Sequence, residues 1–167
     1  MNKFIPKSYR KSIFDIDYEK LQKKHKIKVL LFDFDNTIIA HKKYEIDKKT
    51  KELFEELSKN FIVYVVSNSV NTKKLDMICK KLDIPYIGGS MKPLTRGFKK
   101  LKLKTKNEQI AMIGDQIMTD IYGGNKMGYH TILIDPINEK TEIIFTKINR
   151  KIEKLIKKQV KKGDYYD

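Results

Sequence analysis

Continuous apolar runs alternate with amphipathic stretches along the middle of the chain. Ile27–Asp33 and Phe61–Val66 are almost entirely apolar, which is the pattern of strands buried on both faces of a sheet. Asp47–Lys59 carries its apolar residues on one side, behind an aspartate suited to cap a helix. Asn71–Leu82 has apolar residues at the same helical spacing. The pattern predicts strands that alternate with helices.

Shorter patterns extend this alternation towards the C-terminus. Strands are predicted at Pro85–Ile87, Gln109–Ile113 and Thr131–Ile134. Helices are predicted at Pro93–Leu103, which a proline opens, and at about residues 117–126. Alternation of this kind favours right-handed crossovers. We therefore expect one α/β, Rossmann-like domain, with a parallel sheet of about five strands and helices on both faces.

Polar residues follow the carboxyl ends of the predicted strands. Ligands of such sheets collect at this edge, so residues from separate loops are expected to meet there. They comprise Asp33, Asp35, Thr37, Ser67, Asn68, Lys92, Asp115 and Asp120.

This set suits attack on a phosphoryl group. A carboxylate can attack an anionic phosphate only where a metal and a cation neutralise charge. Asp33 and Asp35 lie two positions apart, so their side chains leave an extended backbone on the same side, as a nucleophile and a proton donor. Asp115 would complete an oxygen-only Mg²⁺ site. Lys92 would supply positive charge, while Ser67 and backbone N–H groups would hold phosphate oxygens.

Each of these residues also has an ordinary structural explanation. An Asp-x-Asp pair at a strand end is often turn chemistry, and Asp115 could cap a helix. Lys92 is one of 33 lysines. It is the joint occurrence at successive strand ends that indicates a phosphatase-type site.

In this order the residues resemble the haloacid dehalogenase (HAD) superfamily of phosphatases, over about residues 27–134. The chain looks more closely like the YqeG family of HAD subclass IIIA, which is related to phosphatidylglycerophosphatases. This likeness covers nearly the whole chain. Its motifs are Ser12-Ile13-Phe14-Asp15-Ile16, Asp35-Asn36-Thr37, Lys92-Pro93 and Gly114-Asp115-Gln116 with Thr119-Asp120.

The resemblance implies a role for each candidate residue. Asp33 would form an aspartyl-phosphate, and Asp35 would protonate the leaving alcohol and then activate water. Mg²⁺ would be held by the Asp33 carboxylate, the Asp35 backbone carbonyl and Asp115. Asp120 and Thr37 are expected to support this site indirectly, Asp120 through a metal-bound water or by orienting its neighbours. The phosphate would be bound by Ser67, Asn68 and Lys92.

No inserted cap domain is expected. Only 31 residues separate Asp35 from Ser67, and only 24 separate Ser67 from Lys92. The predicted elements account for nearly all of them. An open site favours a substrate whose bulk stays outside, such as a lipid headgroup, a macromolecule or a metabolite covered by another subunit.

The charge of +15 is concentrated at the two ends. Residues 1–28 hold nine basic and three acidic side chains, and residues 143–163 hold eight and one. We divide the chain into a basic N-terminal segment (1–26), a HAD phosphatase core (27–138) and a basic amphipathic C-terminal helix (139–167). The helix would lie on an anionic membrane or dock on its own sheet. Its apolar stripe is Ile144, Phe145, Ile148, Ile152, Leu155, Ile156 and Val160.

The remaining composition bears on location. One cysteine, Cys79, excludes a disulfide framework, and no apolar run is long enough to span a bilayer. We expect a cytoplasmic protein. A second expectation is that it contacts the inner face of the membrane as a peripheral protein.

These observations favour a Mg²⁺-dependent phosphomonoesterase that converts phosphatidylglycerophosphate to phosphatidylglycerol at the membrane surface. The particular lipid is implied by the resemblance alone. A phosphatase for nucleic-acid ends, phosphoproteins or small metabolites is a second hypothesis, although the chain has only three arginines for bidentate phosphate contacts. The third is a non-catalytic basic binding module on the same fold.

Overall fold

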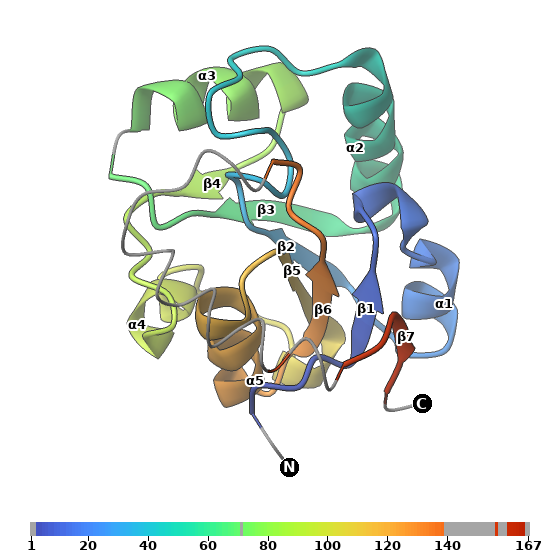
Figure 1. Cartoon of the computed structure of the whole chain (residues 1–167). Helices are drawn as coiled ribbons and strands as arrows, with labels where there is room; N and C mark the ends of the chain where they lie inside the picture. The colour runs from blue at the N-terminus through green and yellow to red at the C-terminus, as the bar shows by residue number, and fades with distance from the viewer. Residues whose placement is uncertain (1–2, 71, 139–155, 157–159, 166–167) are drawn as a thin grey trace.

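A seven-stranded, mostly parallel sheet forms the centre of the computed structural model, which describes residues 3–70, 72–138, 156 and 160–165 (Figure 1). The strand order is β4-β3-β2-β5-β6-β1-β7, and β7 alone runs antiparallel to its neighbour. The strands are β1 (Ser8–Arg10), β2 (Val29–Phe32), β3 (Ile62–Val66), β4 (Tyr86–Ile87), β5 (Ile110–Gly114), β6 (His130–Ile134) and β7 (Gly163–Asp164).

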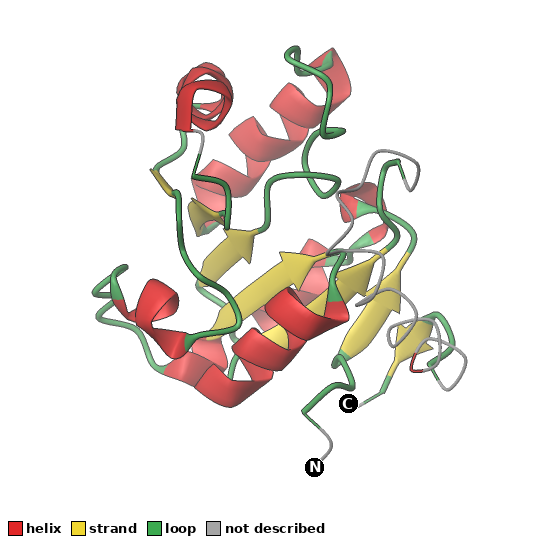
Figure 2. Cartoon of the chain, turned by 60° about the vertical axis from the view of Figure 1, so that its left-hand side comes forward, coloured by secondary structure: helices red, strands yellow, loops and turns green. Residues whose placement is uncertain are grey.

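Helices cover both faces of this sheet (Figures 1 and 2). The helices are α1 (Tyr18–Lys23), α2 (Lys48–Asn60), α3 (Thr72–Leu82), α4 (Thr95–Lys99) and α5 (Tyr122–Met127). Short 3-10 turns lie at Ile13–Asp15 and Asn107–Gln109, and a π-helical turn at Ile117–Ile121 leads into α5.

Alternate residues of the central strands point to opposite faces and build two separate cores. Leu30 and Phe32 of β2 pack with α1, α2 and α3 on one face. Val29 and Leu31 of the same strand pack with α4 and the end of α5 on the other. Because both faces are buried, β2 is apolar throughout, which is why its sequence shows no alternation.

The α/β architecture expected from the sequence is confirmed, and the sheet is larger than the five strands expected. The two additional strands are β1 and β7 at one edge. The helix expected at Asp47–Lys59 is confirmed as α2, where the Asp47 side chain accepts a hydrogen bond from Thr50 N at 2.7 Å. The helix expected at Pro93–Leu103 is shorter than predicted and ends at Lys99.

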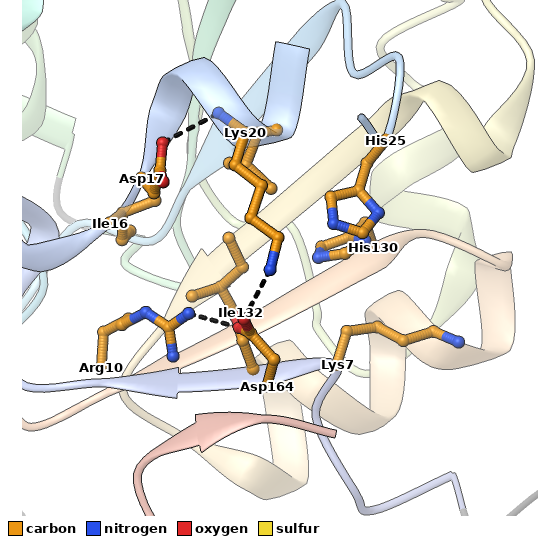
Figure 3. A pocket seen from close by; sticks show the side chains of 11 residues that line it. Lys7, Arg10, Ile16, Asp17, Lys20, His25, His130, Ile132 and Asp164 are labelled. Atoms are coloured by element: carbon orange, nitrogen blue, oxygen red, sulfur yellow. Dashed lines mark hydrogen bonds and ion pairs between the residues drawn. The ribbon is translucent and has the colours of Figure 1, made fainter. Parts of the chain in front are cut away.

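The C-terminal strand β7 pairs with β1 beside a small pocket (Figure 3). Asp164 of β7 pairs with Arg10 of β1 and, at 2.8 Å, with Lys20 of α1. The same small pocket is lined by His25 and His130, whose ring centroids are 4.7 Å apart. These contacts fix the two short edge strands to the domain.

Most of the predicted amphipathic helix, residues 139–155 and 157–159, lies outside the described residues. Val160 is buried against Tyr9 and Leu133, and Ile156 packs on the same cluster. Within the described part of the chain, no helix has the length and apolar character needed to cross a membrane.

Candidate active site

The carboxyl ends of β2, β4 and β5 bring three predicted site residues together. Asp33 directly follows β2, and its backbone N–H donates to Ile113 of β5. Asp115 directly follows β5, and Lys92 lies in the loop between β4 and α4. The parallel order of these strands therefore produces the meeting point that the sequence predicts.

Lys92 is buried between two carboxylates. Its Nζ lies 2.6 Å from Oδ1 of Asp33 and 2.7 Å from Oδ1 of Asp120. Burial alone would lower the pKa of Lys92, but the two carboxylates outweigh it and hold that pKa above its ordinary value. Lys92 is therefore a fixed positive charge.

Asp33, Asp115 and Asp120 form an acidic cluster, each offering a carboxylate oxygen within 4.8 Å of the other two. Burial raises the pKa of Asp120 to about 7, although Lys92 opposes this shift. Lys92 contacts two of these three carboxylates, Asp33 and Asp120. The hard oxygen donors and the excess of negative charge fit a Mg²⁺ ion, which prefers carboxylate ligands and keeps several waters.

Gly114 makes room for this cluster. A Cβ built on Gly114 would lie 2.2 Å from Oδ2 of Asp120, which is far closer than any real contact. The same Asp120 oxygen accepts a hydrogen bond from Gln116 N at 3.2 Å. Thr37 approaches from the β2 side and donates to Asp115 Oδ1 at 3.4 Å. The Gly-Asp motif is therefore needed for close packing as well as for its charge.

Asn68 holds the loop that carries Lys92 in place through hydrogen bonds. Its Oδ1 accepts hydrogen bonds from Lys92 N at 2.7 Å and from Ser90 Oγ at 2.8 Å, and its Nδ2 donates to Lys92 O at 2.9 Å. Ser67 is buried, and its Oγ accepts a hydrogen bond from Ser69 N at 3.1 Å. Both residues lie at the predicted edge, and their contact with phosphate stays a prediction.

Asp35, two residues after Asp33, has partners of its own. Lys74 of α3 donates to Asp35 Oδ1 at 3.1 Å and to the backbone oxygens of Ala40 and His41 at 3.2 and 2.7 Å. His41 Nδ1 lies 3.3 Å from the same Asp35 oxygen. All three Lys74 protons therefore hold Asp35 and the following loop in place.

Lys74 and His41 were not among the residues predicted to serve the site. Lys74 lies one position before the core residue Leu75, on the site side of α3. In a chain with 33 lysines this position alone does not distinguish it from a solvated lysine. The only available signal was its placement in the first turn of the helix that follows Ser67.

Comparisons with known proteins show which proteins the chain is similar to. The family model described as mitochondrial PGP phosphatase matches residues 1–138. The chain is 33% identical to "Probable phosphatase YqeG" of Bacillus subtilis over 161 residues, covering 95% of this chain and 92% of that protein. It is 26% identical to phosphatidylglycerophosphate phosphatase 1, chloroplastic/mitochondrial, of Arabidopsis thaliana, covering 95% of this chain but only 49% of the relative.

Two solved structures share the fold. The magnesium-bound HAD-hydrolase YfnB of Bacillus subtilis has a TM-score of 0.53 at 13% identity, covering 76% of this chain and 99% of that one. The cobalt-bound deoxy-D-mannose-octulosonate 8-phosphate phosphatase of Haemophilus influenzae has a TM-score of 0.51 at 18% identity, covering 81% and 90%. These likenesses identify the fold as the HAD fold.

Proposed function

The chain belongs to the mitochondrial PGP phosphatase family, and from this premise we propose that it is a Mg²⁺-dependent phosphomonoesterase acting on phosphatidylglycerophosphate. A HAD-type phosphatase is supported by the family and by the fold. The observation that carries the proposal is the buried Lys92 between Asp33 and Asp120, with Asp115 completing the acidic cluster.

In the first step, a carboxylate oxygen of Asp33 attacks the phosphorus atom. A new P–O bond forms to Asp33, and the bond from phosphorus to the glycerol oxygen breaks. Asp35 donates its proton to the departing oxygen, so phosphatidylglycerol leaves with a neutral hydroxyl group in place of an alkoxide. Lys92 offsets the negative charge of the phosphoryl oxygens during transfer.

In the second step, water hydrolyses the aspartyl-phosphate. Asp35, now a carboxylate, takes a proton from the water while the water oxygen bonds to phosphorus. The P–O bond to Asp33 breaks, which restores the carboxylate and releases inorganic phosphate. The fixed position of Asp35 beside Lys74 suits one residue that acts in both steps.

Asp33, Asp115 and Asp120 are the side chains that would hold Mg²⁺. The resemblance to the family adds the backbone carbonyl of Asp35. When bound, the ion supplies Lewis-acid stabilisation of negative charge on the phosphoryl oxygens. The chain's own residues provide the nucleophile, the proton and the fixed ammonium group.

The lipid substrate rests on the family and on the open site. Between Asp35 and Ser67 the chain forms only a loop, α2 and β3, so no inserted cap covers the acidic cluster from this segment. One curated relative carries phosphatidylglycerophosphate in its name. An open site suits a substrate whose acyl chains remain in a bilayer.

The direct test is phosphate release from phosphatidylglycerophosphate in mixed micelles, with Mg²⁺ or with EDTA. Asp33→Asn should abolish release, while Asp76→Asn, an aspartate on α3 away from the cluster, should retain it. Phosphate release from an aryl phosphate but not from the lipid would support the phosphatase activity and show that the proposed lipid is not the substrate. No release from any phosphomonoester would favour a non-catalytic binding module.

A further inference from the structure

Large apolar side chains are exposed on loops at the edge of the sheet where the acidic cluster lies. Within the described residues, five of the seven exposed large apolar side chains lie on loops that follow β2, β3, β4 and β6. These loops share the carboxyl edge of the parallel sheet with Asp33. The five, called the apolar rim here, are Tyr44, Val70, Met91, Leu94 and Ile137, with exposed fractions from 50% to 88%.

The apolar rim is attached to the catalytic loops. Met91 and Leu94 flank Lys92 in one turn, closed by a hydrogen bond of 2.9 Å from Leu94 N to Met91 O. Ile137 N donates to Asn36 O at 2.9 Å, which ties the loop after β6 to the Asp33–Asp35 segment. The Nζ of Lys74, which holds Asp35, lies 5.7 Å from the centre of the Tyr44 ring. A surface that contacts the rim therefore reaches the site.

Exposed basic residues accompany the rim in sequence. Lys42 and Lys43 precede Tyr44, Lys73 follows Val70 by three positions, and Arg96 follows Leu94 by two. Apolar side chains with basic neighbours are typical of surfaces that lie at a bilayer interface with anionic lipid. A second copy of the chain is a poorer match, because two basic rims would repel each other in a protein of charge +15.

We propose that the apolar rim docks on an anionic lipid bilayer and inserts its side chains around the opening of the site. This inference rests on the proposed function and adds the surface through which the substrate arrives. Asp33 and Lys92 are both buried, at 8% and 5% exposure, so they reach a headgroup phosphate only when the lipid surface lies against the rim. Docking through the rim lets the substrate enter without leaving the membrane.

The protein contains no tryptophan, so one introduced tryptophan reports its own surroundings. We would compare Val70→Trp and Leu94→Trp with Ile62→Trp, a matched exposed position at the start of β3 and thus at the opposite edge of the sheet. Fluorescence is recorded with vesicles of phosphatidylcholine alone or mixed with phosphatidylglycerol. The two rim variants should shift their emission to shorter wavelength on the anionic vesicles, and Ile62→Trp should not.

A second variant tests the energetics of docking. Val70→Ser combined with Leu94→Ser should weaken binding to the same anionic vesicles at least tenfold, about 1.4 kcal/mol, whereas Ile62→Ser should not weaken it. Thermal unfolding of each variant checks the fold. These vesicles contain no substrate, so the docking test does not depend on hydrolysis. If the rim variants shift their emission but the protein does not hydrolyse phosphatidylglycerophosphate, the docking surface is supported and the proposed substrate is wrong.

Three results would overturn the proposal. Vesicle binding with no shift at either rim position would assign docking to another part of the chain. An equal shift at Ile62→Trp would show that no particular face is used. A doubled mass in light scattering, with rim shifts in the absence of vesicles, would make a second copy the partner.

Discussion

The Nζ of Lys92 lies 2.7 Å from Oδ1 of Asp120, and both side chains are only 1% exposed. The two residues come from segments that precede and follow β5 in the sequence, one from the loop after β4 and one from the π-helical turn before α5. Their ion pair therefore connects these two segments. A buried pair of this kind is costly to break, because the remaining partner keeps its charge without compensation.

Replacing Lys92 should damage both stability and activity. Lys92→Met leaves Asp33 and Asp120 facing each other without the ammonium group. We expect a loss of about 3–5 kcal/mol in the free energy of unfolding, measured by urea titration. Hydrolysis should fall by about 10²–10³-fold. Lys99→Met, an exposed lysine of α4, serves as the control and should change neither quantity.

Lys74→Met should slow the reaction in a way that depends on the leaving group. Without its three hydrogen bonds the Asp35 carboxyl is no longer held in position. Alkyl phosphates need a proton on the departing oxygen, whereas an aryl phosphate with an acidic leaving group needs it far less. We therefore expect a larger loss of kcat for glycerol phosphates than for p-nitrophenyl phosphate. Equal losses for both substrates, or the same loss in Lys80→Met, would show that Lys74 has no such role.

Gly114→Ala should displace Asp120. The new methyl group would meet the Asp120 carboxylate and its hydrogen bond to Gln116. We expect weaker Mg²⁺ binding, seen as a smaller rise in the melting temperature when the ion is added. Asp120→Asn should reduce that rise in the same way. A Gly114→Ala protein with the wild-type response to Mg²⁺ would show that the close contact has no functional consequence.

The pairing of Asp164 should make a pH-dependent contribution to stability. The hydrogen bond from Lys20, together with Arg10, holds the pKa of Asp164 below its ordinary value. Because folding lowers this pKa, the ionised carboxylate stabilises the fold at pH values above the pKa of the unfolded chain, about 3.9. That contribution is lost as the pH falls through the folded value. Asp164→Asn should thus cost at most about 1 kcal/mol at pH 7, since the pair is partly exposed.

Urea titrations at pH 7 and pH 3 test this expectation, because the difference between wild type and Asp164→Asn should shrink at the lower pH. A difference that is the same at both values would assign the effect to packing rather than to charge.

Most of the site was predictable because its residues directly follow strands with clear apolar patterns. Asp33 and Asp115 directly follow β2 and β5, and parallel strands bring such ends together. Asp120 was expected in a supporting role, and the structure adds that it shares one cluster with these two residues. Its position depends on the π-helical turn at 117–121, which the helical pattern of the sequence does not distinguish from ordinary helix.

The edge strands and Lys74 were not predictable for different reasons. β1 is only three residues long, Ser8, Tyr9 and Arg10, and has no alternating pattern to recognise. It becomes a strand through pairing with β6 and β7, which lie far away in the sequence. Lys74 acquires its partners only when α3 packs beside the loop after β2.

The proposed mechanism requires that Asp33 carries the phosphoryl group, and this intermediate can be trapped. Protein mixed with substrate and Mg²⁺ would be quenched in acid within the first turnover, digested and analysed by mass spectrometry. We predict one added phosphoryl group on the peptide containing Asp33, labile to hydroxylamine and absent from Asp33→Asn. A phosphoryl group on another residue, or turnover that persists in Asp33→Asn, would show that Asp33 is not the nucleophile.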